Sequence, residues 1–357
     1  MPPLSEAPEL KALLERIGPV DRQAGDATRA YLDTLTKPPG SLGRLEALAV
    51  QLSEITGQTQ PGVGPPAVIV FAADHGVAAE GVSAFGQEVT AQMVANFAAG
   101  GAAINVFARR IGARLEIVDV GVAGEIQASE VTHARIRRGT DNILYAPAMS
   151  RQDAVASLNA GVHSAQQALA AGCRCLMVGE MGIANTTAAS AMLSILAGSP
   201  AAGLVGNGTG ISSIALAHKV GIVERAVAAR RGDAHDPLGV LADLGGFEVG
   251  AMAGAYLAGA AKGVPCIVDG FIATVAALLA CELCPAVRGY LVFGHRSEEP
   301  GHGVALKALD AEPLLSLGMR LGEGTGATLA YPLLDAACAM LGQMATFGDA
   351  GIDDDRR

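Results

Sequence analysis

Short apolar runs alternate with longer alanine-rich stretches through most of this chain. Continuous apolar runs are typical of strands buried on both faces of a parallel sheet, and they fall at residues 67–72, 115–120, 174–178, 203–205, 264–268 and 290–293. Helices are predicted between them, at residues 89–110, 151–171, 185–198, 212–230, 248–262 and 270–284. This rhythm predicts an α/β fold with a mostly parallel, Rossmann-like sheet and helices on both of its faces.

The N-terminal region follows a different pattern. Leucine and isoleucine recur at helical spacing between residues 8 and 17, and a Gly/Pro-rich linker at residues 57–66 ends the helical part. We expect residues 1–60 to pack with residues 311–348 as a smaller helical lobe. Residues 61–310 would then form a large α/β domain. The acidic tail after residue 348 is expected to be a disordered end.

Polar residues gather where the predicted strands end. They are Asp74, His75, Asp119, Glu180, Asn207, Asp269, His295, Arg296 and Ser297. In open parallel sheets the ligand crevice lies outside the carboxyl ends of the strands. The sequence therefore predicts one pocket at that edge.

The segment from Val178 to Thr187 is the clearest candidate for chemistry. A Gly-Glu-Met-Gly turn follows an apolar strand and precedes a helix, where Asn185 or Thr186 could cap the first turn. Glycine lets the backbone approach a ligand closely, and the N-terminus of a helix attracts an anion such as a phosphate. A carboxylate beside an anion site costs free energy, so we expect Glu180 to have a chemical role there.

Two further glycine turns could serve the same pocket. Gly206-Asn207-Gly208-Thr209-Gly210 precedes a predicted helix that carries Lys219, so backbone N–H groups and an ammonium could share one phosphate. This turn is neither a Walker motif nor a GxGxxG dinucleotide fingerprint. In the second turn, Gly322 and Gly324 flank Glu323, a carboxylate with no evident helix-pairing role.

Charge and hydropathy exclude several kinds of partner. The net charge of −10 argues against a general surface for nucleic acid or an anionic membrane. Hydrophobic residues make up 50% of the chain, but the longest apolar stretches are rich in alanine and glycine, which favours buried helices over membrane insertion. The N-terminus has neither the basic region nor the apolar core of a signal peptide, so we expect a cytoplasmic protein.

Metal and covalent chemistry have weak support. The six cysteines lie mostly in apolar runs, and Cys281-Glu282-Leu283-Cys284 is a single CxxC motif without a second half, so we expect buried thiols rather than zinc. His75, His295 and His302 could be metal ligands, but they lack helical metal-site spacing. No G-x-S-x-G elbow points to a serine nucleophile. We therefore expect neither a metal nor a cofactor.

Ordered motifs across about residues 30–345 resemble the nicotinate-nucleotide–dimethylbenzimidazole phosphoribosyltransferase family. They are Thr36-Lys37-Pro38-Pro39-Gly40-Ser41-Leu42-Gly43, Ala73-Asp74-His75-Gly76-Val77, Gly81-Val82-Ser83-Ala84-Phe85, Glu88-Val89-Thr90, Gly179-Glu180-Met181-Gly182, Asn185-Thr186-Thr187, Gly245-Gly246-Phe247-Glu248, Asp269-Gly270, Gly294-His295-Arg296-Ser297 and Gly322-Glu323-Gly324. The chain departs from the family pattern at Gly86, Ala184 and Asn207, where proline, glycine and arginine are expected. The last departure removes a possible phosphate cation.

The resemblance implies transfer of 5-phosphoribose from nicotinate mononucleotide to 5,6-dimethylbenzimidazole, giving α-ribazole 5′-phosphate and nicotinate. The step would be a single displacement with inversion at C1′. It implies small-molecule substrates as the partners, with no nucleic acid, in a homodimer that needs no cofactor. The donor carries a cationic pyridinium leaving group, so neither an acid nor a metal is needed to expel it.

The resemblance also assigns roles to residues. Glu323 would be the general base, and its glycine and apolar neighbours predict a raised pKa. The remaining assignments are Ser83, Met181 and Leu321, with Gln87 or Gln92, for the benzimidazole slot; Gly182, Gly208 and Lys219 for the phosphate; and Glu180, Asp269 and Ser297 for ribose or nicotinate. Asn185, Thr186 and Gly322 complete the expected substrate-binding set. Glu180 is also a possible substitute base.

Two other functions remain compatible with these residues. A nicotinate-nucleotide hydrolase would use the same donor pocket with water as the acceptor. A non-catalytic nucleotide sensor would keep the phosphate turns but would have no use for an isolated Glu323.

Overall fold

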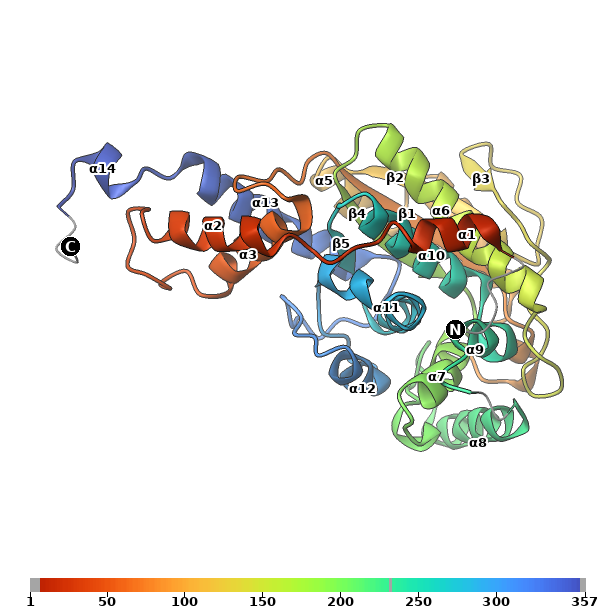
Figure 1. Ribbon diagram of the computed structural model, residues 1–357. Helices are drawn as coiled ribbons and strands as arrows, with labels where there is room; N and C mark the ends of the chain where they lie inside the picture. The colour runs from red at the N-terminus through yellow and green to blue at the C-terminus, as the bar shows by residue number, and fades with distance from the viewer. Residues whose placement is uncertain (1–6, 231–232, 354–357) are drawn as a thin grey trace.

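The computed structural model describes residues 7–230 and 233–353 of the 357-residue chain. Within this part, six strands form one sheet in the order β3-β2-β1-β4-β5-β6, and all neighbouring strands are parallel (Figure 1). They are β1 (Pro66–Ala73), β2 (Arg114–Gly121), β3 (Val131–His133), β4 (Cys175–Met181), β5 (Cys266–Val268) and β6 (Leu291–Phe293). The α/β fold with a parallel sheet, predicted from the alternating pattern, is confirmed.

Helices surround the sheet. They are α1 (Pro8–Leu14), α2 (Arg22–Leu32), α3 (Arg44–Thr56), α4 (Glu88–Ala98), α5 (Ala103–Arg110), α6 (Arg151–Ala170), α7 (Asn185–Leu196), α8 (Ser213–Arg230), α9 (Pro237–Leu244), α10 (Phe247–Ala261), α11 (Phe271–Leu283), α12 (Gly301–Ala308), α13 (Thr325–Gln343) and α14 (Phe347–Ala350). One apolar core lies under α6, α10 and α11, and a second lies under α3, α4, α5 and α13.

The central strand β1 shows how one sheet serves two cores. Ile69 and Phe71 belong to the core under α6 and α10, while Val68 and Val70 belong to the core under α4 and α13. Successive side chains of a strand point to opposite faces, so a run that is apolar at every position buries both faces. This is why the strands read as continuous apolar runs.

Three details differ from the sequence prediction. The predicted strand at residues 203–205 is wrong, because a short 3-10 turn at Ala201–Gly203 occupies its start. The predicted helix at residues 89–110 is two helices, and Ala102 donates its N–H to the Asn105 side chain as α5 begins. By length and composition alone, this apolar stretch could cross a membrane. The strand β3 and the helix α9 were not predicted.

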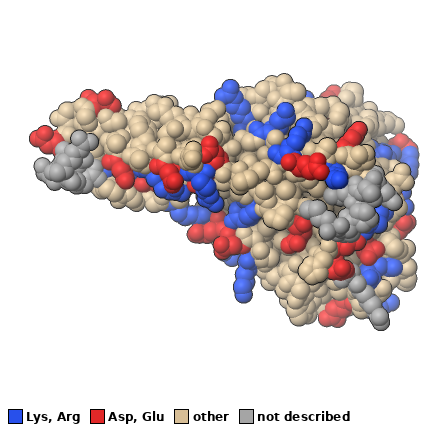
Figure 2. Space-filling model, in the orientation of Figure 1, with Lys and Arg blue, Asp and Glu red and all other residues tan. Residues whose placement is uncertain are grey.

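Helices α2, α3 and α13 pack together and, with α14, project away from the sheet (Figure 1). Helix α1 instead packs against α10. The division of the chain into two domains stays a prediction. Of the predicted tail, residues 349–353 are described and include the end of α14, whereas residues 354–357 lie outside the described part. Acidic and basic side chains are interspersed on the face shown in Figure 2.

The strand order reverses between β1 and β4. Strands β2 and β3 follow on one side of this pair, and β5 and β6 follow on the other. In open α/β sheets, such a switch point leaves a crevice at the carboxyl ends of the strands. The segment that follows Met181 begins at this crevice.

Candidate active site

A cavity of about 590 Å³ lies at the carboxyl ends of β4, β5 and β6. Most of the residues predicted to form the site line it. They are Ser83, Glu180, Met181, Gly182, Asn185, Thr186, Gly208, Lys219, Asp269, Ser297, Leu321, Gly322 and Glu323. Segments far apart in the sequence therefore share one site, as expected of strand ends in a parallel sheet.

Gln87 and Gln92 do not line the cavity. The Gln87 amide donates to the backbone oxygen of His75 at 2.6 Å, and Gln92 is exposed on α4. The residues of α4 that line the cavity are Val89 and Met93. They lie one helical turn apart on the same face, whereas position 92 points about 100° away from position 93.

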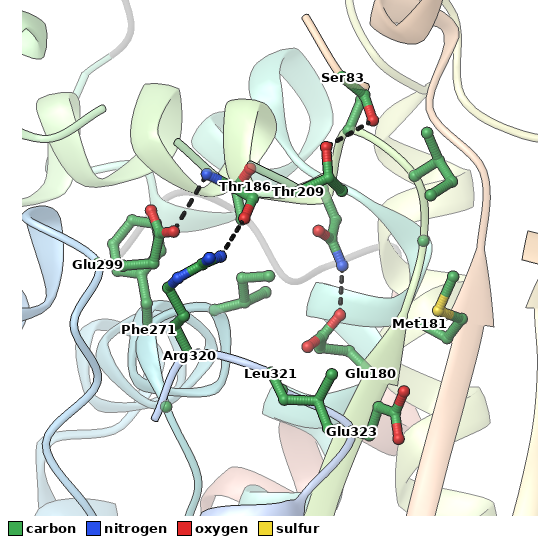
Figure 3. A pocket seen from close by; sticks show the side chains of 18 of the residues that line it. Ser83, Glu180, Met181, Thr186, Thr209, Phe271, Glu299, Arg320, Leu321 and Glu323 are labelled. Carbon is green, nitrogen blue, oxygen red and sulfur yellow. Dashed lines mark hydrogen bonds between the residues drawn. The ribbon is translucent and has the colours of Figure 1, made fainter. Parts of the chain in front are cut away.

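One end of the cavity is acidic. Glu180 is buried near the end of β4, and its carboxylate accepts a short hydrogen bond from the Asn185 amide (Figure 3). Burial raises the pKa of Glu180 well above its usual value, and the negative charges of Glu248 and Asp269 add to the shift. Burial therefore favours the protonated form of this carboxyl group. The Asn185 side chain thus binds Glu180 and does not cap α7.

Glu323 lies at the same end, on a turn that only small residues permit. Its φ is +63°, and a Cβ on Gly179 would lie 2.3 Å from the Glu323 backbone. Such a backbone conformation is costly for a residue with a side chain and is often found at functional positions. Burial raises the pKa of Glu323 to about 7, with a further contribution from the charge of Asp269. Its Oε2 atom is buried and has no hydrogen-bond partner among the described residues.

Asp269 holds this turn in place. Its carboxylate accepts N–H groups from Gly324 at 3.2 Å and from Ala327 at 2.9 Å, at the start of α13. A carboxylate in this position caps the helix and suits the positive end of its dipole. Asp269 lines the cavity, but both of its oxygens are already occupied by the backbone that carries Glu323.

The other end of the cavity is the turn around Gly208. Lys219 is 1% exposed, and its ammonium donates to the Thr186 hydroxyl at 2.8 Å and to the backbone oxygen of Gly206 at 3.2 Å. Burial lowers the pKa of Lys219 to about 8, against the opposing effect of the Glu299 charge. Thr186 therefore binds the lysine and does not cap α7.

Two residues at this end were not predicted. The Glu299 carboxylate accepts the N–H of Gly208 at 3.1 Å, and the Arg320 guanidinium donates to the backbone oxygen of Gly208 at 2.8 Å (Figure 3). Both residues belong to segments that the sequence analysis had singled out, close to Ser297 and Leu321. Only Arg320 carried a signal in the sequence, since it is a cation directly before the Leu-Gly-Glu turn.

An apolar wall lies between the two ends. Val82, Phe85, Val89, Met93 and Leu321 line it. Phe85 is 54% exposed and Leu321 is 57% exposed, although both are large and apolar. A flat aromatic ligand placed here would cover them and remove apolar surface from water, which is favourable.

Ser83 connects this wall to the glycine turn. Its hydroxyl lies 3.2 Å from the Thr209 hydroxyl, which also accepts the N–H of Ala84 at 2.9 Å. The loop that precedes α4 is thereby joined to the turn that carries Gly208. Ser83 lines the cavity at this junction.

The loop after β6 is fixed by His302. The N–H of Ser297 donates to Nδ1 of His302 at 2.8 Å, so the ring proton lies on Nε2, which is 3.0 Å from the Thr274 hydroxyl. That hydroxyl in turn donates to the backbone oxygen of Gly270. Burial lowers the pKa of His302 to about 3, which keeps the ring neutral. Ser297 and Glu299 are therefore held against the start of α11.

The polar residues at the ends of β1 and β2 lie outside the cavity. The carboxylate of Asp119 binds the Gly121 and Val122 N–H groups and pairs with Arg135. Asp74 accepts the Thr90 hydroxyl and the Ala123 N–H. These carboxylates are fully occupied by the protein.

The geometry offers no evident metal site. Among residues 7–230 and 233–353, no group of three or more histidine, cysteine or acidic side chains is arranged to hold a metal ion. Cys281 and Cys284 are buried, and burial raises the pKa of the Cys281 thiol to about 12.

Comparison with known proteins identifies the family. A family model described as phosphoribosyltransferase matches residues 17–352. A relative from Roseiflexus sp. (strain RS-1), named nicotinate-nucleotide–dimethylbenzimidazole phosphoribosyltransferase, is 51% identical over 96% of this chain and 98% of its own length. A relative of the same name from Pseudomonas fluorescens (strain SBW25) is 52% identical over 94% of this chain and 96% of its own.

A solved structure leads to the same family. The crystal structure of the enzyme of that name from Thermus thermophilus has a TM-score of 0.89 and 46% identity, and the match covers 94% of this chain and 99% of that one. Sequence and fold agree. The chain therefore belongs to the nicotinate-nucleotide–dimethylbenzimidazole phosphoribosyltransferase family.

Proposed function

We propose that this enzyme transfers 5-phosphoribose from nicotinate mononucleotide to 5,6-dimethylbenzimidazole by a single displacement at C1′. The observation that carries the proposal is one cavity that holds Glu323 at one end, with its Oε2 atom lacking a hydrogen-bond partner among the described residues, and a buried ammonium of Lys219 at the other. A displacement of this kind needs a base for the acceptor and an anchor for the donor's phosphate, and it needs them in one site.

The chemistry proceeds without a metal or a covalent intermediate. One ring nitrogen of the benzimidazole attacks C1′, and the bond between C1′ and the pyridinium nitrogen breaks. The electron pair of that bond returns to the pyridine ring, which leaves as nicotinate. Attack opposite the leaving group inverts C1′, so a β donor gives an α product.

Glu323 accepts the proton from the other ring nitrogen of the benzimidazole. A general base acts best when its pKa lies near the working pH, and the pKa of Glu323 is about 7. Asp269 positions the turn that carries Glu323. Glu180, which accepts a hydrogen bond from Asn185, lines the same cavity and binds an oxygen of the donor.

The phosphate binds at the Gly208 turn. Lys219 supplies a buried cation, and the N–H of Gly182 lies at the start of the segment that leads into α7. Arg320 brings a second cation to the same turn. It supplies the charge that an arginine at position 207 would have given.

The acceptor binds against the apolar wall. Ser83, Met181 and Leu321 line this part of the cavity together with Phe85. Exposed apolar side chains on the wall favour a flat, weakly polar ring over water as the acceptor. This preference supports transfer over hydrolysis.

Product analysis by mass spectrometry tests the proposal. Purified enzyme with nicotinate mononucleotide and 5,6-dimethylbenzimidazole should yield α-ribazole 5′-phosphate and nicotinate, and omission of the acceptor should nearly abolish nicotinate release. Nicotinate release at the same rate without the acceptor would identify a hydrolase. Binding of the nucleotide with no turnover would identify a sensor.

The assembly is part of the proposal. We infer a cytoplasmic homodimer, and the family resemblance supports the dimer. Sedimentation velocity tests the dimer, because a monomer at micromolar concentration would contradict it.

A further inference from the structure

The carboxylate of Glu299 occupies the place where the phosphate is expected. Its Oε1 accepts the N–H of Gly208 at 3.1 Å. A Cβ built on Gly206 would lie 2.1 Å from Oε2 of Glu299, so the carboxylate rests directly on the glycine turn. Backbone N–H groups of such a turn are the donors that would otherwise bind a phosphate oxygen.

The buried cation faces the same point. A Cβ on Gly208 would lie 3.1 Å from the Lys219 ammonium, so Gly208 lies between this ammonium and the Glu299 carboxylate. The charge of Glu299 raises the pKa of Lys219 and partly offsets the effect of burial. The protein thus supplies its own counter-ion to the cradle, by which we mean Gly206, Gly208 and Lys219.

The buried carboxylate of Glu299 makes few hydrogen bonds. Its Oε2 has no hydrogen-bond partner among the described residues, although the side chain is 7% exposed. A buried oxygen without a donor costs free energy, so the arrangement is easily exchanged for a better one. The backbone of Glu299 is fixed by bonds to Ser297 and His302, which leaves the side-chain torsions as the moving part.

We propose that Glu299 is a resident anion in the phosphate cradle and that the donor's phosphate must displace it to bind. This inference rests on the proposed function, because the displaced position is the phosphate site. It makes Glu299 a specificity-determining residue. Inorganic phosphate must displace Glu299 and in return makes contacts with the cradle alone. The nucleotide must also displace Glu299, but it makes further contacts through its ribose and its ring. Small anions are thereby kept from Lys219.

Binding of inorganic phosphate tests the inference. Isothermal titration of the full-length wild type and of Glu299→Gln should show phosphate binding roughly tenfold tighter in the variant, a difference typical of one removed charge contact. Glu298→Gln is the matched control, because Glu298 is the adjacent residue, carries the same charge and is exposed. It should leave the phosphate affinity unchanged.

A gain of affinity cannot result from a damaged fold, so the expected result is specific. Equal or weaker phosphate binding by Glu299→Gln would overturn the inference and assign Glu299 to support of the turn. If this variant does not fold, Glu299→Asp keeps the charge but withdraws it from Gly208. It should also bind phosphate more tightly, and unchanged or weaker binding would again contradict the inference. Failure of the proposed function would appear separately, in product analysis of the wild type.

Discussion

The two ends of the cavity treat buried charge in opposite ways. At the acidic end, Glu180 and Glu323 lie together, no cation within the described part of the chain is bonded to either carboxylate, and burial raises both pKa values. At the cradle, Lys219 is buried close to the Glu299 carboxylate. Its ammonium donates to the Thr186 hydroxyl and to the backbone oxygen of Gly206, while Glu299 accepts the N–H of Gly208. The acidic end therefore holds a base whose pKa is close to neutral pH, and the cradle holds a buried cation.

The comparison shows what burial contributes to each role. Without a counter-ion, burial brings the pKa of a carboxylate up to the range where it can accept and release a proton. With a counter-ion close by, burial costs a cation less, and the pKa of Lys219 stays near 8. The acidic end should therefore govern turnover, and the cradle should govern donor binding.

The largest expected effect is on turnover. Glu323→Gln removes the base and should lower kcat by about 10² or more, while nucleotide binding survives. Steady-state kinetics with both substrates saturating measures this. The control is Glu180→Gln, which imitates the neutral form of Glu180 and should lose much less activity. Near-normal rates in Glu323→Gln, with loss only in the double variant, would reassign the base to both residues.

The next effect is on donor binding. Lys219→Met keeps the length of this buried side chain but removes its charge, so the KM of nicotinate mononucleotide should rise by roughly 10- to 100-fold, as for a lost charged hydrogen bond. The value of kcat should change little. A defect confined to kcat would show that Lys219 acts on the reacting atoms and does not anchor the phosphate.

Glu323→Gln, which should lower activity, should raise the stability of the folded protein at high pH. The pKa of Glu323 is raised in the folded protein from 4.5 to about 7, so the folded state disfavours its charged form. The wild type therefore loses stability as pH rises from about 4.5 to about 7, whereas Glu323→Gln does not. The free energy of unfolding of the variant should exceed that of the wild type by up to ~3 kcal/mol at pH 8 and should not exceed it at pH 4.

Chemical denaturation at the two pH values measures this difference. Equal stability of wild type and variant at pH 8 would mean that Glu323 is solvated or paired in solution. That result would contradict the claim that burial at the acidic end raises the pKa of Glu323.

The smallest expected effect concerns the segment that joins the two ends. Ala184 has φ +74°, a conformation that favours glycine. Ala184→Gly should stabilise the fold by about 0.5 kcal/mol, since relief of the left-handed strain outweighs the loss of one buried methyl group. The same denaturation assay measures it. A destabilised variant would show that packing of this methyl group matters more than the backbone.

The sequence predicted the fold well because its strands are buried on both faces and therefore read as continuous apolar runs. Val68 and Ile69 serve different cores, yet both must be apolar. The apolar run at residues 203–205 was too short to show whether it forms a strand or a turn. Strand β3 was not predicted, because only Val131 of this strand belongs to the core.

The site was predicted in part, because residue type and glycine context identify strand-end chemistry but not its partners. Glu180 and Asp269 were found by position, whereas the bonds that make Asp269 a helix cap depend on the fold. Gln87 was misplaced because its amide binds the backbone of His75. Glu299 escaped notice because only the folded chain places its carboxylate on the Gly208 turn.

The pH dependence of kcat/KM tests the central claim, that the buried carboxylate of Glu323 acts as the base. The wild-type kcat/KM should rise with pH through a pKa of about 7 that belongs to Glu323, and it should fall again as Lys219 loses its charge above a pKa of about 8. Glu323→Gln should lack this rise and should fall about 10²-fold below the wild type at pH 8. A variant that keeps both the rise and the wild-type rate would contradict the account.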